Sequence, residues 1–109
     1  MKVAIIGSRG ITDLDISKYM PEGIDLIISG GARGVDTLAE KYADEHGIPK
    51  LIIRPDYDLY GRRAPLVRNK IIVDNADLVI AFWDGESRGT SYTVEYAIKQ
   101  GVPRKLYMI

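Results

Sequence analysis

Five short apolar segments recur along the chain, at residues 3–6, 26–28, 51–53, 78–82 and 106–109. Each segment is a continuous apolar run that does not alternate with polar residues. Strands buried on both faces have this pattern, because helices cover both sides of a parallel sheet. The pattern therefore predicts a five-stranded parallel sheet.

The segments between these strands carry apolar residues at helical spacing. Residues 35–46 follow an i, i+3, i+4, i+7 series, which ends at Gly47. Residues 66–76 form a second helical pattern, with Pro65 in its first turn. Residues 92–100 form a third. These patterns predict one helix in each of the last three connections between consecutive strands.

Two connections have weaker patterns. Residues 12–20 predict a short helix capped by Thr12 or Asp13, and residues 54–63 are expected to form a long loop. The alternation of strands and helices predicts an α/β fold, a three-layer αβα sandwich with a Rossmann-like sheet, because right-handed crossovers place helices on both faces. We expect the strand order 3-2-1-4-5 and a single domain over residues 1–109.

Composition narrows the classes of function. Hydrophobic residues make up 46% of the chain and charged residues 28%, as in soluble globular proteins. Fifteen basic residues balance fifteen acidic residues, so no overall positive field favours nucleic acid or a membrane surface. The chain has no cysteine, which excludes disulfides and thiolate sites. Without a leader or an apolar run of ~20 residues, we expect a cytoplasmic protein with no membrane contact and no metal site.

Residues 28–36 join the second predicted strand directly to a helix. Glycines there permit a positive φ and close backbone approach, and free N–H groups at a helix N-terminus bind anions. The expected anion-binding residues are Gly30, Gly31, Arg33 and Gly34. Alternatively, the glycines only form a tight turn. Asp36 either accepts a ribose hydroxyl or is a first-turn acid stabilised by the helix dipole.

A second loop of this kind, residues 84–90, follows the fourth strand. Gly89 lets the backbone come close to a ligand, and the hydroxyls of Ser87 and Thr90 can donate to a phosphate or cap the following helix. We expect these residues, together with Asp84, to form a second part of the binding site.

The arginines are distributed unevenly. Seven of them follow strands at the carboxyl edge, where open α/β sheets bind ligands, and only Arg104 is on the other side. Because arginine is preferred for bidentate phosphate and carboxylate contacts, this segregation indicates an anionic ligand. The alternative is a solvated network with nearby acids. Tyr57, Tyr60 and Trp83 lie near the same edge and could stack on a base or pack against the protein.

These residues resemble the SLOG superfamily of Rossmann-like domains, and within it the YspA-type, cpYpsA-related branch. The matching residues are Gly7-Ser8-Arg9 with Thr12-Asp13, the segment from Ser29 to Asp36, Tyr60-Gly61-Arg62 with Ala64 and Arg68-Asn69, and the segment from Asp77 to Phe82 with Gly89-Thr90. The resemblance implies a signalling or NAD-derived nucleotide as ligand, with Gly7, Ser8, Arg9, Arg68 and Asn69 completing the walls of its site.

Two further resemblances imply other functions. Residues 29–36 and 68–72 are similar to the DprA/Smf proteins, which bind single-stranded DNA. The loop before Gly89-Thr90 is similar to that of the LOG phosphoribohydrolases, although Thr93 stands where those enzymes have glutamate. The enzyme interpretation would use Asp84 or Glu95 as the acid–base group.

The sequence therefore predicts a domain that binds or senses a small phosphorylated nucleotide. The alternatives are a nucleotide N-glycosidase and a DprA-like DNA-binding module, although we do not expect a nucleic-acid partner. We also expect a homodimer that buries an apolar helix face, either residues 71–73 or Tyr92 with Tyr96.

Overall fold

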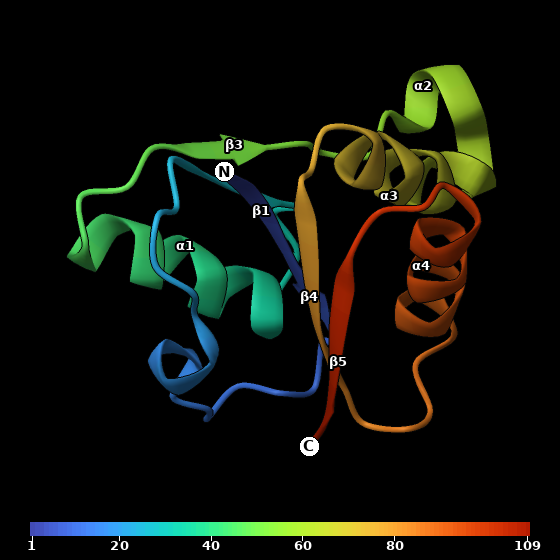
Figure 1. The fold of residues 1–109 in the computed structure, drawn as a ribbon. Helices are drawn as coiled ribbons and strands as arrows, with labels where there is room; N and C mark the ends of the chain where they lie inside the picture. The colour runs from blue at the N-terminus through green and yellow to red at the C-terminus, as the bar shows by residue number, and fades with distance from the viewer.

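One parallel sheet forms the centre of the molecule in the computed structural model, which describes residues 1–109 (Figure 1). The strands are β1 (Lys2–Gly7), β2 (Leu26–Ser29), β3 (Lys50–Ile52), β4 (Leu78–Trp83) and β5 (Arg104–Met108). Their order is β3-β2-β1-β4-β5, and every neighbouring pair is parallel. The predicted fold class and strand order are confirmed.

Helices cover both faces of this sheet. The helices are α1 (Val35–Glu45), α2 (Tyr57–Tyr60), α3 (Ala64–Asp74) and α4 (Arg88–Lys99), with two short 3₁₀ turns, η1 (Ile16–Tyr19) and η2 (Gly61–Arg63). Figure 1 shows α1 on one side of β1 and β4, and α3 with α4 on the other. The helices all lack the combination of length and apolar composition that a membrane-spanning helix requires.

Two apolar clusters fill the space between the three layers. Alternate residues of β4 point to opposite faces, so Ile80 and Phe82 pack toward α1 while Val79 and Ala81 pack toward α3 and α4. Phe82 is fully buried, and its ring lies 5.2 Å from that of Tyr19 in an edge-to-face contact. The central strands are therefore buried on both faces, as their continuous apolar runs predict.

The two edge strands differ from that prediction. Leu51 in β3 and Leu106 and Met108 in β5 are exposed. A continuous apolar run does not distinguish an edge strand from a central one, and the helices cover mainly the middle of this sheet. The prediction of burial on both faces is wrong for β3 and β5.

Local hydrogen bonds move several predicted boundaries. Helix α4 begins at Arg88 and not at residue 92, because Ser87 is its N-cap. The expected helix at residues 12–20 is only the turn η1, and its cap is Asp15, whose Oδ1 accepts from the Ser17 N–H at 3.1 Å. The expected loop at residues 54–63 contains α2 and η2.

The helix faces expected at a dimer interface are largely covered. Ile72 and Val73 are buried against the sheet, so residues 71–73 do not form an exposed apolar face. The Tyr96 hydroxyl donates to Asp74 at 2.8 Å, and the Lys70 ammonium lies over the rings of Tyr92 and Tyr96. These two tyrosines join α4 to α3 within the chain.

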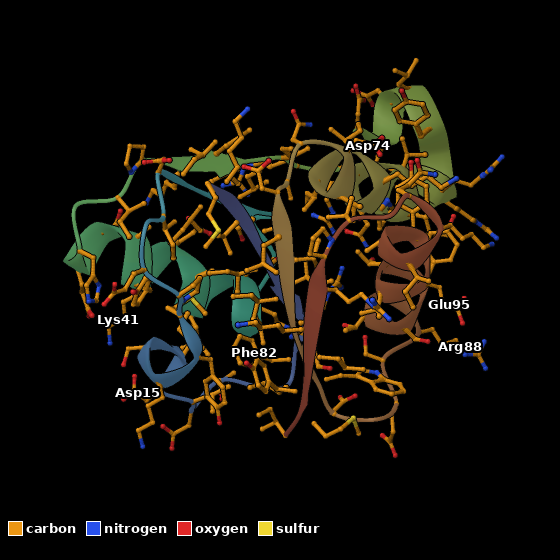
Figure 2. All side chains as sticks on the ribbon, in the orientation of Figure 1. Asp15, Lys41, Asp74, Phe82, Arg88 and Glu95 are labelled. Carbon is orange, nitrogen blue, oxygen red and sulfur yellow. The ribbon has the colours of Figure 1, made fainter.

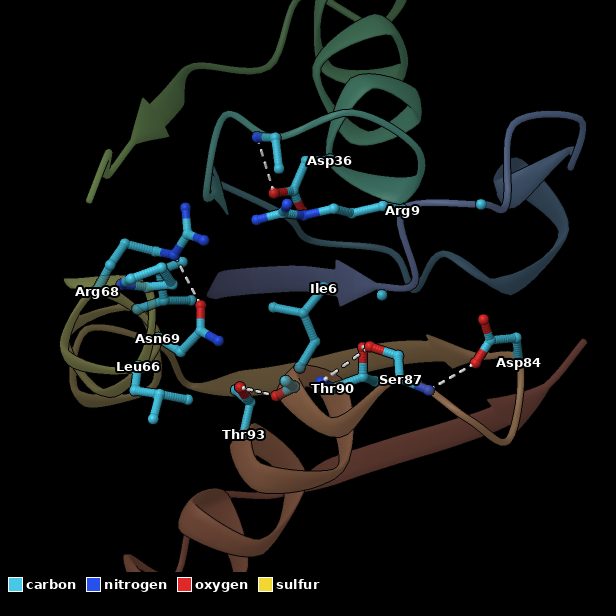
Figure 3. A pocket seen from close by; sticks show the side chains of 16 residues that line it. Ile6, Arg9, Asp36, Leu66, Arg68, Asn69, Asp84, Ser87, Thr90 and Thr93 are labelled. Atoms are coloured by element: carbon cyan, nitrogen blue, oxygen red, sulfur yellow. Dashed lines mark hydrogen bonds between the residues drawn. The ribbon is translucent and has the colours of Figure 1, made fainter. Parts of the chain in front are cut away.

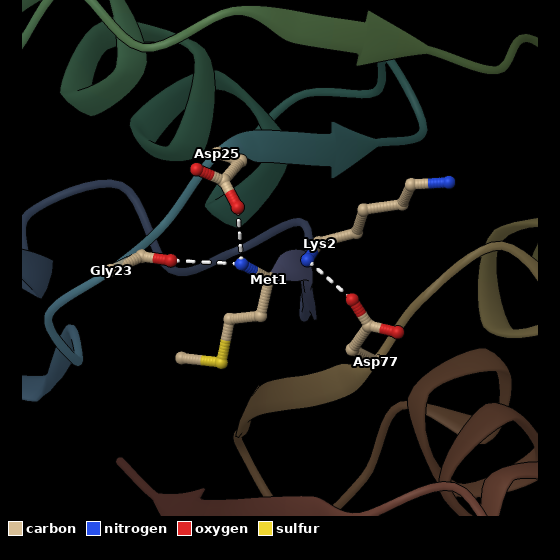
Figure 4. Close-up of polar contacts among 5 residues, drawn as sticks. All are labelled: Met1, Lys2, Gly23, Asp25 and Asp77. Carbon is tan, nitrogen blue, oxygen red and sulfur yellow. Dashed lines mark hydrogen bonds and ion pairs between the residues drawn. The ribbon is translucent and has the colours of Figure 1, made fainter.

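One ion pair and two further hydrogen bonds hold the amino edge of the sheet (Figure 4). The ammonium group of Met1 donates to Asp25 Oδ2 at 2.6 Å and to the Gly23 carbonyl at 2.9 Å. The Lys2 N–H donates to Asp77 Oδ2 at 2.7 Å. These contacts fix the start of β1 relative to the segments that lead into β2 and β4, at the edge opposite the carboxyl ends.

Candidate functional site

A cavity of about 380 Å³ lies at the carboxyl ends of β1 and β4 (Figure 3). The chain crosses to opposite faces of the sheet after these two neighbouring strands, and such a switch point is where open α/β sheets bind ligands. The lining residues are Ile6, Gly7, Arg9, Gly10, Ala32, Asp36, Pro65, Leu66, Arg68, Asn69, Ile72, Asp84, Ser87, Gly89, Thr90 and Thr93.

The start of α4 forms one wall of this cavity. Asp84 Oδ1 accepts from the N–H groups of Glu86 and Ser87, at 2.8 and 2.9 Å. The hydroxyl of Ser87 lies 3.2 Å from that of Thr90 and caps the helix. The N–H groups of Arg88 and Gly89 have no partner within the chain. Free N–H groups at the positive end of a helix dipole favour an anion here.

The loop after β1 forms the opposite wall. The N–H groups of Arg9 and Gly10 also have no partner within the chain. Ser8 has a different role, since its buried hydroxyl accepts from the Asp84 N–H at 3.1 Å. Its carbonyl accepts from the Ile11 N–H. Ser8 therefore ties the two walls together and does not line the cavity, although it was expected among the ligand-binding residues.

Arg68 and Asp36 are charged residues buried at the back of the cavity. Arg68 Nη1 donates to the Gly30 carbonyl, and Nε donates to Asn69 Oδ1 at 2.7 Å. Asp36 Oδ2 accepts from the Ala32 N–H at 3.1 Å. Burial raises the pKa of the Asp36 carboxyl, opposed by the Ala32 hydrogen bond and the nearby Arg68 charge. Burial likewise lowers the pKa of Arg68, opposed by Asp36.

Several glycines of the predicted site make room for protein groups. A Cβ on Gly7 would lie under 3.0 Å from the Phe82 carbonyl, and one on Gly34 would overlap the Arg9 backbone. A Cβ on Gly30 would overlap the guanidinium of Arg68. These glycines therefore permit close packing of the loops, as well as any approach of a ligand.

Gly10 and Gly89 are different. A Cβ on either glycine would meet no protein atom within 4 Å, and both residues line the cavity. Gly10 was not among the predicted site residues, and neither were Leu66 and Thr93, which also line the cavity. Thr93 is one turn beyond Gly89, whose carbonyl it contacts at 2.7 Å through its hydroxyl, so helical spacing from Gly89 could have identified it.

The other predicted anion-binding residues line a second, adjoining cavity of about 700 Å³. Gly30, Gly31 and the exposed Arg33 lie there together with Arg54 and Tyr57. Arg54 Nη1 donates to the Gly31 carbonyl at 3.3 Å. The two cavities share Arg9, Ala32 and Arg68. Gly34 is buried and lines neither.

The two acid–base candidates are separated. Asp84 lines the central cavity, and hydrogen bonds from the Glu86 and Ser87 N–H groups lower the pKa of its carboxyl. Glu95 lies on the outer side of α4 (Figure 2), in a separate hollow with Trp83 and not in the central cavity. The Trp83 indole N–H donates to the Ser87 carbonyl at 2.9 Å.

Two of the loops that line this cavity lie in a part of the chain that matches a known protein family. The model of the YspA, cpYpsA-related SLOG family matches residues 1–60 of the chain. The chain belongs to this family. The matched residues include the Arg9 loop and the loop at residues 30–36, whereas the α4 wall lies outside them.

Two individual proteins extend the comparison beyond the family match. The chain is 32% identical to the Gene 61 protein of Mycobacterium phage D29, over 94% of this chain and 92% of that protein. The crystal structure of DNA processing protein A, DprA, from Streptococcus pneumoniae matches with a TM-score of 0.71 and 22% identity. That match covers 98% of this chain and 49% of DprA. This family member therefore spans about half of DprA, and the likeness shows the shared fold.

Proposed function

We propose that this SLOG family member binds a small phosphorylated, nucleotide-derived ligand in the central cavity. The observation that carries the proposal is that two walls present free backbone N–H groups, from Arg9 and Gly10 on one side and from Arg88 and Gly89 on the other. Three of these four residues line the cavity directly. Donors of this kind bind phosphate without a dedicated side chain.

The surrounding side chains suit the rest of such a ligand. The volume of about 380 Å³ lies within the usual range for small-molecule sites. Arg9 is exposed and supplies a positive charge at the cavity, and Asn69 of α3 supplies an amide there. Asp36 has a second carboxylate oxygen available for a ribose hydroxyl, because only Oδ2 accepts from Ala32.

Calorimetric titration with AMP, ADP-ribose and NAD tests this proposal. We expect binding of at least one of them by the parent chain, weakened about tenfold to a hundredfold in Arg9→Ala, because a charge-assisted contact contributes roughly 1.5–3 kcal/mol. The matched control is Lys41→Ala, which removes an exposed charge on α1 outside both cavities. No binding of any of the three, or equal weakening by both variants, would refute it. Assaying the same mixtures for released base or phosphate tests hydrolysis.

A second candidate is binding of single-stranded nucleic acid across the adjoining cavity. The observation in its favour is the group of exposed residues Arg33, Arg54 and Tyr57 at this cavity, with two more exposed arginines, Arg62 and Arg63, further along the chain. Arginines beside an aromatic ring can hold phosphates and stack on a base. Binding of a labelled oligonucleotide would then fall steeply as salt rises, because counterions are released on binding. Its failure leaves the nucleotide proposal unaffected.

A further inference from the structure

The outer edge of β5 has an unpaired row of backbone groups. The Val79 N–H donates to the Pro103 carbonyl, and the Ile109 N–H donates to the Trp83 carbonyl. The odd-numbered residues of this stretch therefore bond β4. Alternate residues of a strand bond opposite neighbours, so Arg104, Leu106 and Met108 direct their N–H and C=O groups away from the sheet.

Exposed apolar side chains lie along this free edge. Leu106 pairs in register with Ala81, which packs toward α3 and α4, so its side chain lies on that face of the sheet. Leu106 is 44% exposed and Met108 is 62% exposed, and Ile98 of α4 is 50% exposed. The opposite edge strand, β3, has three residues and begins with an exposed lysine, Lys50. The β5 edge also begins with two exposed basic residues, Arg104 and Lys105, but it is the longer template for pairing and exposes two large apolar side chains, whereas β3 exposes only Leu51.

Opposite charges lie at the two ends of the edge. Arg104 is exposed at the start of β5, and the loop after β4 carries Glu86, which is also exposed, at the other end. That loop lies beside the end of β5, since a Cβ added to Gly85 would lie 3.4 Å from Met108 Cε. Neither Arg104 nor Glu86 takes part in a salt bridge within the chain.

We infer that a second copy of this chain pairs with the β5 edge in antiparallel orientation, with the two-fold axis at Leu106. In this register Leu106 faces its own counterpart, and Arg104 faces Met108 of the other copy. All three outward residues then form hydrogen-bonded pairs. The same register brings Arg104 toward the acidic loop of the other copy, so the two ends of the edge are complementary in charge. The sheets of the two copies then become continuous.

Such a pair differs from the helix-face dimer that the sequence predicts. It leaves α3 and α4 in their intrachain contacts and uses residues that the chain otherwise leaves exposed. It also places a basic residue of one copy beside the loop that carries Asp84 and leads to α4 in the other. Glu86, Arg104, Leu106 and Met108 do not line the central cavity, so the pairing leaves the central cavity of each copy uncovered.

A single engineered cysteine tests the register, because the parent chain has none. In Leu106→Cys, the hydrogen-bonded pair at the two-fold axis separates the Cα atoms by about 5.5 Å, within the range of a disulfide. We expect mild oxidation to convert most of this variant into a reducible dimer. The matched control is Leu51→Cys, on the opposite edge and 39% exposed, which is expected to stay monomeric on the same gel.

Light scattering and a charge exchange complete the test. The parent chain is expected at twice 12.1 kDa in the low micromolar range. Arg104→Glu and Glu86→Arg should each raise the dimer Kd at least about tenfold, and the double variant should restore it, because like charges across an interface are strongly unfavourable. A monomeric parent, equal crosslinking by Leu51→Cys, or no restoration in the double variant would overturn the inference.

Discussion

Adding one methyl group at Gly89 should stabilise the fold and weaken ligand binding. Gly89 lies in the first turn of α4, and a Cβ there meets no protein atom within 4 Å. Alanine is the better helix former, so Gly89→Ala should raise the free energy of unfolding by about 0.5–1 kcal/mol. For a domain of this size, that corresponds to a rise in Tm of about 2–8 °C.

The same methyl group would stand beside the free N–H groups of Arg88 and Gly89. If a phosphate binds there, losing one charge-assisted hydrogen bond reduces the affinity by about tenfold to a hundredfold. Calorimetry measures both quantities, as a thermal scan and as a titration with the tightest of the three nucleotides. Stability and affinity are expected to change in opposite directions.

Gly34→Ala is the matched comparison, because it adds the same atom where the chain has no room. Gly34 has a φ of 76°, and its Cβ would overlap the backbone of Arg9. The strained backbone alone should lower stability by about 1–3 kcal/mol. If Gly89→Ala binds nucleotide as the parent does, the α4 wall is only a capped helix start. If it lowers Tm, the space described at Gly89 is wrong.

Three further predictions concern stability. Burial raises the pKa of the Asp36 carboxyl in the folded chain, so the contribution of this group to the free energy of unfolding should fall as pH rises above its ordinary pKa of 3.8 and level off above the folded pKa. Urea unfolding across this range should show the parent losing stability relative to Asp36→Asn as pH rises, and a parent that gains stability relative to Asp36→Asn would contradict the prediction. Ser87→Ala removes the side chain that caps α4 and should lower the free energy of unfolding by about 1 kcal/mol in the same assay. An unchanged free energy of unfolding would mean that the hydrogen bonds to Asp84 are sufficient to hold this turn. Phe82→Ala should lower it by about 3–5 kcal/mol, because a fully buried ring leaves a cavity between the sheet and α1; a loss under 1 kcal/mol would contradict that packing.

The continuous apolar runs predicted the sheet correctly, because each run can be recognised within a few neighbouring residues. The run at residues 78–82 is apolar at every position, and the structure buries both of its faces. The same signal in β5 does not show that a strand is at the edge, since exposure depends on which elements pack nearby. The start of α4 was missed for another local reason, because residues 88–91 have no apolar pattern and only the Ser87 cap marks the boundary.

The sequence predicts which loops form the site, but it does not predict which residues of these loops face the ligand. Parallel topology brings the carboxyl ends of β1, β2 and β4 together, so Arg9, the glycine-rich loop and Gly89 could be assigned to one edge. Whether a glycine faces a ligand or a neighbouring segment depends on contacts between distant residues. Gly34 touches Arg9, and Gly30 touches Arg68 from α3, and neither contact has a signature in the sequence.

Trp83 gives this chain a built-in optical probe. It is the only tryptophan, and its indole N–H is hydrogen-bonded to the carbonyl of Ser87, the residue that caps α4. An anion drawn to the first turn of α4 would change the polarity and hydrogen bonding around that indole. Fluorescence emission of the unmodified chain should therefore follow occupancy of the central cavity directly, so that candidate metabolites can be screened without a label.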